Sequence, residues 1–263
     1  MQYQTFSDAQ IETLVNAINT DGFAVLPGWA TDAELSELQA MVTETVSTAG
    51  NQYVALSGSE AVAGSLLHEW GKSPSFLDLC QRVAAKGTGQ LSAESGLHQV
   101  LRCLIGEQGQ RESLIFHYDS FVLTTIMPVY MPEKIGTGDL IMIPNHRRIR
   151  KNYASNLIDK LLIDNRWSQR RLAKRHAKHA DAFTQIRMRP GDMYLFWGYR
   201  SLHTNLPADP NSIRATAVFH YQNVHGYSSI ANRIRQSLAQ LKPRRAAHTG
   251  EPQTQPKSFA KTP

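Results

Sequence analysis

In the N-terminal third of the chain, apolar positions recur every three or four residues, which is the spacing of amphipathic helices. Ser7 and Gln10 form a capping box that opens a helix, and Gly22 ends it. Thr31 and Glu34 form a second capping box. The pattern predicts a helix after each box, a short apolar strand at 23–26 between them, and further helical stretches at 60–70 and 75–86.

After Gly96 the pattern changes to short apolar runs that are separated by Gly, Pro and Asn. These runs predict strands at 99–105, 114–116, 121–129, 140–143, 193–197 and 214–221. Polar, helix-forming sequence at roughly 150–182 interrupts them. Short strands at this spacing are typical of an antiparallel sandwich or jelly roll, so we expect a mainly β fold with flanking helices.

The composition is that of an ordinary globular protein, with 41% hydrophobic and 19% charged residues in a chain of 263. We expect one domain at 1–242 and a disordered tail at 243–263, which is rich in Pro, Thr, Gln and Lys. We expect no membrane span and no secretory signal, because neither pattern occurs. Cys80 and Cys103 are too few for a disulfide framework, which favours free thiols and a cytoplasmic protein.

The net charge of +6 is unevenly distributed along the chain. Residues 146–189 carry 13 Lys and Arg against 3 Asp and Glu, and the tail at 243–263 adds a further +3, so the remainder is acidic. The basic insertion at 146–189 is either a solvated helical excursion or a surface that steers an anionic substrate. A uniformly basic nucleic-acid-binding domain would look different, and the insertion has few aromatic residues for base stacking.

The tetrapeptide Phe116-His117-Tyr118-Asp119 is the most specific local feature. Alternate side chains of a strand share a face, so His117 and Asp119 would converge on one point. An imidazole and a carboxylate are two of the three ligands in a facial triad for non-haem iron. A lone His-x-Asp also occurs as a purely structural pair, so the interpretation depends on a third ligand.

His203 is the best candidate for that ligand among the ten histidines. It follows the apolar strand at 193–197 and a short loop, where the mouth of a barrel would lie. Farther on, Arg214 and Thr216 share one face of the last predicted strand. A buried Arg needs an anionic partner, and its planar fork matches a carboxylate.

In this order, the residues resemble the phytanoyl-CoA hydroxylase-like family of iron(II)- and 2-oxoglutarate-dependent dioxygenases. The resemblance rests on the entry at 21–28, His117-Tyr118-Asp119, the run at 138–146, the segment from Arg189 to His203, and Arg214-x-Thr216. Asn145 departs from the family's pattern, in which a small residue stands at that position. The ordered set spans residues 7–221.

The resemblance implies a double-stranded β-helix, also called a jelly roll or cupin-like core, that holds Fe(II) through His117, Asp119 and His203. O2 would be the oxidant, and the substrate would be oxidised at a C–H bond. Related halogenases replace the metal-binding carboxylate by a small residue to make room for halide. Asp119 therefore favours hydroxylation.

The resemblance also implies 2-oxoglutarate as cosubstrate, with its distal carboxylate on Arg214 and Thr216. The residues that hold the near carboxylate vary across the family. Gln99 and Arg102, on the strand before the iron motif, are candidates for that role, and Thr125 is a candidate pocket hydroxyl.

Other residues with site chemistry have plainer interpretations. His146 is a rival of His203, although its counterpart in the family is not a ligand. His220 shares a strand face with Arg214, and a hydrogen-bonded core histidine is the simpler account. His176 and His179 lie within a basic stretch that favours a solvated face. Trp197 and Tyr199 are either core residues or part of the pocket wall.

The leading hypothesis is an oxygenase that acts on a small or medium anionic metabolite, or on a substrate linked to a lipid or carrier. A non-catalytic binding protein on the same scaffold is the alternative, and the complete set of ligand candidates argues against it. A third hypothesis, an anion- or nucleic-acid-binding module that uses the basic insertion, lacks any recognised motif. The sequence leaves the oligomeric state open.

Overall fold

The computed structural model describes residues 5–92, 95–148, 163 and 165–223. All elements named below belong to one compact unit, Met1–His225. The predicted domain end at 242 and the predicted disordered tail at 243–263 fall outside the described residues. The same holds for residues 150–162 and 164 of the helical sequence predicted at 150–182.

The predicted N-terminal helices are present. Helix α1 (Asp8–Thr20) and helix α2 (Asp32–Thr48) both begin at the expected capping boxes, and strand β1 (Ala24–Leu26) lies between them. The stretch predicted at 60–70 is two short elements, η1 (Glu60–Val62) and α3 (Leu66–Lys72), and α4 (Pro74–Thr88) follows. Gly64, with a φ of +75°, separates the two pieces because that conformation does not continue a helix.

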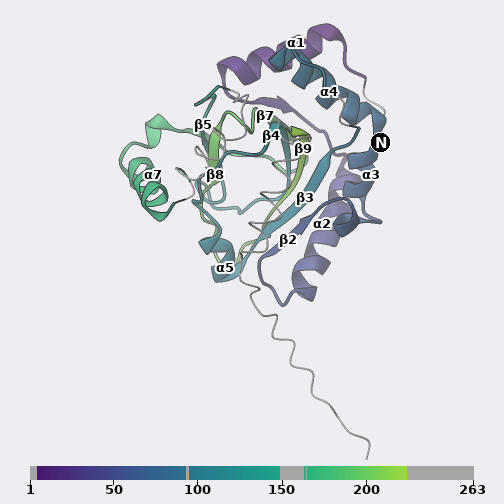
Figure 1. Ribbon diagram of the computed structural model, residues 1–263. Helices are drawn as coiled ribbons and strands as arrows, with labels where there is room; N and C mark the ends of the chain where they lie inside the picture. The colour runs from purple at the N-terminus through teal and green to yellow at the C-terminus, as the bar shows by residue number, and fades with distance from the viewer. Residues whose placement is uncertain (1–4, 93–94, 149–162, 164, 224–263) are drawn as a thin grey trace, which may run out of the picture. The chain divides into compact units, whose positions relative to one another are not determined.

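The strands after Gly96, together with β1 and β2, form two antiparallel sheets (Figure 1). In the described part of the chain, a six-stranded sheet has the order β1-β7-β4-β9-β3-β2, and a three-stranded sheet has the order β6-β5-β8. The strands not yet defined are β2 (Val54–Ser57), β3 (His98–Leu104), β4 (Phe121–Tyr130), β5 (Leu140–Ile143), β6 (Thr184–Ile186), β7 (Met193–Phe196), β8 (Leu202–Asn205) and β9 (Arg214–Asn223).

Several sequence predictions need correction here. The strand predicted at 114–116 is absent, because Leu114 adopts a φ of +55° and the chain there is irregular. A short helix, α5 (Gly106–Arg111), precedes it instead. The predicted strands do not include β8, which begins at Leu202, the last residue of the loop predicted before His203, and strands β2 and β6 were not predicted either. The basic insertion does contain a helix, α7 (Arg166–Lys178), followed by η2 (Ala180–Ala182).

The large sheet separates a helix-covered core from an inner cavity. Helices α2, α3 and α4 pack on one face of the sheet, against strands β3, β4 and β9. On β9 the buried side chains alternate, so Ala215, Ala217 and Phe219 join the helical core while Arg214 and Thr216 face the other way. The small sheet lies opposite, and its Leu140 and Met142 pack with Tyr194 and Phe196 of β7.

Both cysteines belong to the helix-covered core. Cys80 of α4 and Cys103 of β3 are fully buried and free. Burial raises the pKa of both thiols, that of Cys103 to about 12, so both are protonated at neutral pH and act as small core side chains. None of the helices defined above combines the length and apolar character that crossing a membrane requires.

A close contact in this core provides a test of the fold. A Cβ at Gly87 of α4 would lie 2.3 Å from the ring of Trp197, which is buried and donates through Nε1 to Asn19. Although alanine is the better helix former, we expect Gly87→Ala to destabilise the protein by about 1–3 kcal/mol, because the indole cannot move aside. Thermal or urea unfolding measures this, with Gly96→Ala, where a Cβ meets nothing within 4 Å, as the neutral control. Equal stability of both variants would contradict the packing described.

Candidate metal centre

A single bridge between two distant chain segments brings the predicted metal ligands together. The backbone N–H of His117 donates to the carbonyl of His203, and the N–H of His203 donates back to the carbonyl of His117, both at 3.0 Å. His203 lies on β8, whereas His117 lies in the irregular chain between α5 and β4. The prediction that the iron motif lies on a strand is therefore wrong, but the bridge gives His117 the local geometry of one.

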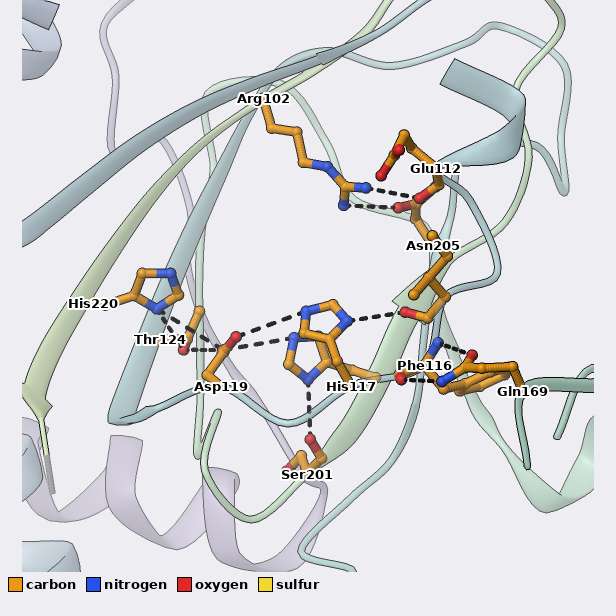
Figure 2. A network of polar contacts seen from close by, with 12 residues as sticks. Arg102, Glu112, Phe116, His117, Asp119, Thr124, Gln169, Ser201, Asn205 and His220 are labelled. Carbon is orange, nitrogen blue, oxygen red and sulfur yellow. Dashed lines mark hydrogen bonds and ion pairs between the residues drawn. The ribbon is translucent and has the colours of Figure 1, made fainter. Parts of the chain in front are cut away.

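The three side chains converge at the inner cavity, and Figure 2 shows His117 and Asp119 turned toward each other there. His117 Nε2 lies 3.7 Å from Asp119 Oδ1, and His203 Nε2 lies 3.6 Å from Asp119 Oδ2. One ligand atom from each residue lies within 4.8 Å of the others. Two imidazoles and one carboxylate that meet in this way are the donor set of the facial triad of non-haem iron(II). The residues present therefore fit such an ion.

Backbone carbonyls orient both imidazoles for metal binding. His117 Nδ1 lies 2.9 Å from the carbonyl of Ile115, and His203 Nδ1 lies 3.0 Å from the carbonyl of Ser201. Because a carbonyl only accepts, each Nδ1 carries a proton, and each Nε2, which faces Asp119, is the nitrogen left to bind a metal. Burial and the neighbouring His203 lower the pKa of His117 to about 4, although Asp119 opposes them, so its ring is neutral near pH 7.

Asp119 is held by groups that the sequence did not reveal. The Thr124 hydroxyl donates to Asp119 Oδ2 at 2.5 Å, and His220 Nδ1 lies 3.9 Å from the same oxygen. Burial by itself raises the pKa of Asp119, but the three histidines and Thr124 outweigh it and hold the pKa at about 2. A Cβ at Gly198 would lie 2.4 Å from Asp119 Oδ2, so only glycine leaves room for this carboxylate.

Helix α7 reaches the metal centre through one side chain. Gln169 Nε2 donates to the carbonyl of Phe116 at 2.7 Å, and Gln169 Oε1 accepts from the Phe116 N–H at 2.8 Å (Figure 2). The side-chain amide of Gln169 thus makes the two backbone hydrogen bonds to Phe116, the residue directly before His117, that a neighbouring strand would otherwise make. This contact links the basic insertion to the iron motif, and no local pattern in the sequence could show it.

Two arginines face the same cavity. Arg214 is 3% exposed, and its Nε donates to the carbonyl of Gly138 at 2.6 Å. Arg102 donates to the Glu112 carbonyl at 2.7 Å. Among the described residues no carboxylate forms an ion pair with either arginine. Asp139, whose charge raises the pKa of Arg214, forms its ion pair with Arg187 instead.

The charge of Arg214 is unfavourable without a partner. Burial lowers the pKa of Arg214 to about 9, Arg102 adds to that effect, and Asp139 opposes it. A small anion that entered the cavity would stabilise both guanidinium groups.

The remaining predicted residues divide between the two faces of the large sheet. Thr216 lines the cavity beside Arg214. Gln99 and Thr125 do not line it: Gln99 packs against Gly71 of α3, and the Thr125 hydroxyl donates to the carbonyl of Phe219. On β4 the cavity-facing hydroxyl belongs to Thr124, because adjacent strand residues point to opposite faces.

The rival candidates have structural partners. The Tyr118 hydroxyl and His146 Nδ1 are 2.5 Å apart, and among the described residues His146 is not in the metal-binding group. His220 lines the cavity and lies 3.1 Å from the Thr124 hydroxyl. His176 packs edge-on against Phe183. Trp197 and Tyr199 are fully buried, as core residues are.

Comparisons with known proteins bear on the fold. No family model and no curated protein matches the chain. Solved structures do match it, among them EctD from S. alaskensis with 2-oxoglutarate and 5-hydroxyectoine, at 17% identity over 82% of this chain and 76% of that chain, with a TM-score of 0.51. The non-heme alpha ketoglutarate dependent epimerase SnoN from nogalamycin biosynthesis matches at 13% identity over 84% and 86%, with a TM-score of 0.50. This chain thus has the jelly-roll fold found in 2-oxoglutarate-dependent oxygenases.

Proposed function

We propose that the protein is a cytoplasmic Fe(II)- and 2-oxoglutarate-dependent oxygenase that hydroxylates a C–H bond of an anionic substrate. The observation that carries the proposal is the convergence of His117, Asp119 and His203 on a cavity that also contains Arg214. A metal triad or a buried arginine alone would have several explanations. A triad and a guanidinium that face one cavity, the latter without a carboxylate partner among the described residues, match a metal-bound oxo acid with a second carboxylate.

The protein's part in the reaction is to hold and orient the metal, the cosubstrate and the substrate. The Nε2 atoms of His117 and His203 and one oxygen of Asp119 would hold Fe(II), and a triad of three protein ligands would leave the metal accessible to cosubstrate and O2. Bound iron with 2-oxoglutarate supplies the oxidising power for C–H hydroxylation. Thr124 fixes the carboxylate through Oδ2, which favours binding through a single oxygen. We assign hydroxylation because Asp119 occupies the position that a halide would need.

The cosubstrate would extend from the metal toward β9. Arg214 and Thr216 would hold the distal carboxylate, since both lie on the cavity face of that strand. Arg102 of β3 lies opposite Thr216 of β9 in the sheet. Its positive charge lowers the pKa of both His117 and Arg214, so it lies near both the metal centre and Arg214. Arg102 is therefore our choice for the near carboxylate. We propose no ligand contact for Gln99 and Thr125.

The substrate we propose is a small or medium anionic metabolite, or one linked to a lipid or carrier. Three features support this: the excess of cations at 146–189, the connection of α7 to the iron motif through Gln169, and the ordered resemblance to the phytanoyl-CoA hydroxylase-like family. We propose that the protein belongs in or near that family, on the basis of the five sequence segments described above.

The metal assignment predicts the loss of iron binding in ligand variants. His117→Ala, Asp119→Ala and His203→Ala should each weaken Fe(II) binding by more than about 100-fold, because replacing groups that only support metal ligands already costs 10–100-fold. Anaerobic titration of the purified protein measures the affinity. His176→Ala, on the exposed helix α7, is the control that should bind iron normally. Normal binding by His203→Ala would overturn the triad.

The role of Arg214 predicts a specific loss of cosubstrate affinity. Removal of one partner from a buried charged pair costs about 2–5 kcal/mol, so Arg214→Ala should bind 2-oxoglutarate tens to thousands of times more weakly. The metal-to-ligand charge-transfer absorbance of the anaerobic iron complex reports this binding. Iron affinity in the absence of 2-oxoglutarate should not change. An unaltered 2-oxoglutarate affinity would mean that another group anchors the distal carboxylate.

The hydrogen bond from Thr124 predicts a difference between neighbouring threonines. Thr124→Val should lower the iron affinity by about 10–100-fold, because it frees Asp119 Oδ2 without changing the side-chain volume much. Thr124→Ser should retain the affinity. Thr125→Val, one residue away on the opposite face, is the matched control. If both valine variants weaken iron binding equally, Thr124 acts on the fold and not on Asp119.

A further inference from the structure

Helix α7 presents a dense cationic face to solvent. Six of its thirteen residues are Lys or Arg, none is acidic, and all six are exposed: Arg166, Arg170, Arg171, Lys174, Arg175 and Lys178. Among the described residues, no carboxylate forms an ion pair with any of them. Figure 1 shows α7 on the side of the unit away from helices α1–α4.

The spacing of these cations works against the helix. Arg166, Arg170, Lys174 and Lys178 follow one another at intervals of four residues, so each repels the next across one turn. No carboxylate in the described part of the chain offsets that repulsion, although Lys178 in the last turn interacts favourably with the helix dipole. Natural sequences break such local rules mainly where function requires it.

The cationic face is not needed to hold α7 in place. Leu172 packs against the cluster of Phe116, Ile141, Phe183, Leu202 and Leu206, and Gln169 binds the backbone of Phe116. Gln169 and Leu172 lie on the side of the helix opposite Arg170 and Lys174, whereas Arg175, at the edge of the cationic face, also lies 5.8 Å from the centre of the Phe183 ring. The outer face is therefore free to bind a partner.

An aromatic side chain lies in the middle of the cationic face. Trp167 is 70% exposed, and at 100° per residue it projects between Arg170 and Arg171, close to the direction of Lys174. The Arg171 guanidinium lies 5.6 Å from the centre of its ring. Ile115, the residue before Phe116, is also exposed, at 42%. An exposed tryptophan surrounded by Lys and Arg suits the boundary between lipid headgroups and acyl chains.

We propose that the outer face of α7 docks on an anionic lipid surface. The cations would lie against the headgroups, and Trp167 would enter the interface between them. Nucleic acid is the less favoured partner, because within the described helix a single aromatic offers no series of stacking platforms. The proposal goes beyond the oxygenase function and does not depend on it.

Sedimentation with vesicles tests the proposal on the full chain, without iron or 2-oxoglutarate. The protein should bind vesicles of phosphatidylcholine mixed with phosphatidylglycerol at low salt, bind weakly to phosphatidylcholine alone, and dissociate at high salt. The double variant Arg170→Glu and Lys174→Glu should bind mixed vesicles at least about tenfold more weakly, since each basic residue near the surface contributes about fivefold. Trp167→Ala should also weaken binding, and Trp167 fluorescence should shift to shorter wavelength in the wild type.

The matched control is Lys72→Glu with Lys134→Glu, which makes the same change in net charge at exposed positions outside α7. This variant should bind mixed vesicles nearly as the wild type does. Equal loss in both double variants would mean that only net charge matters and would overturn the assignment to α7. Absence of wild-type binding to the mixed vesicles would also overturn it, as would binding to a single-stranded RNA but not to the vesicles. None of these results bears on iron or 2-oxoglutarate binding.

Discussion

The reciprocal backbone hydrogen bonds between His117 and His203 are the constraint on which the site depends. They join the irregular chain after α5 to strand β8 and set the two imidazoles side by side, with ring centres 4.4 Å apart. Asp119 then follows two residues after His117 and meets both Nε2 atoms. Its own N–H donates to the carbonyl of Gly198, which ties the loop before β8 to the same point.

In this arrangement three residues are the metal-ligand candidates, and several other groups hold those three side chains in position. Carbonyls hold the histidine tautomers, Thr124 holds one carboxylate oxygen, and Gly198 provides the space. Residues of both sheets line the cavity that contains the triad and the two arginines. One carboxylate, Asp119, lies among histidines, whereas the guanidinium groups of Arg102 and Arg214 have no carboxylate partner within the described residues.

Much of this could be predicted from residue type and spacing. The capping boxes located α1 and α2, and alternation along β9 placed Arg214 and Thr216 on one face. The strand assignment at 114–116 failed because Leu114 adopts positive φ and a side chain, Gln169, takes the place of a neighbouring strand at Phe116. A choice between Thr124 and Thr125 depends on which face of β4 meets the cavity. That follows from tertiary packing and not from local pattern.

The most direct test of the account is a crystal structure of the protein prepared anaerobically with Fe(II) and 2-oxoglutarate, with anomalous scattering recorded at the iron absorption edge. The account predicts one strong peak, bonded to the Nε2 atoms of His117 and His203 and to one oxygen of Asp119, and 2-oxoglutarate extended from it to Arg214. Iron bound elsewhere, or a triad without iron under these conditions, would contradict it.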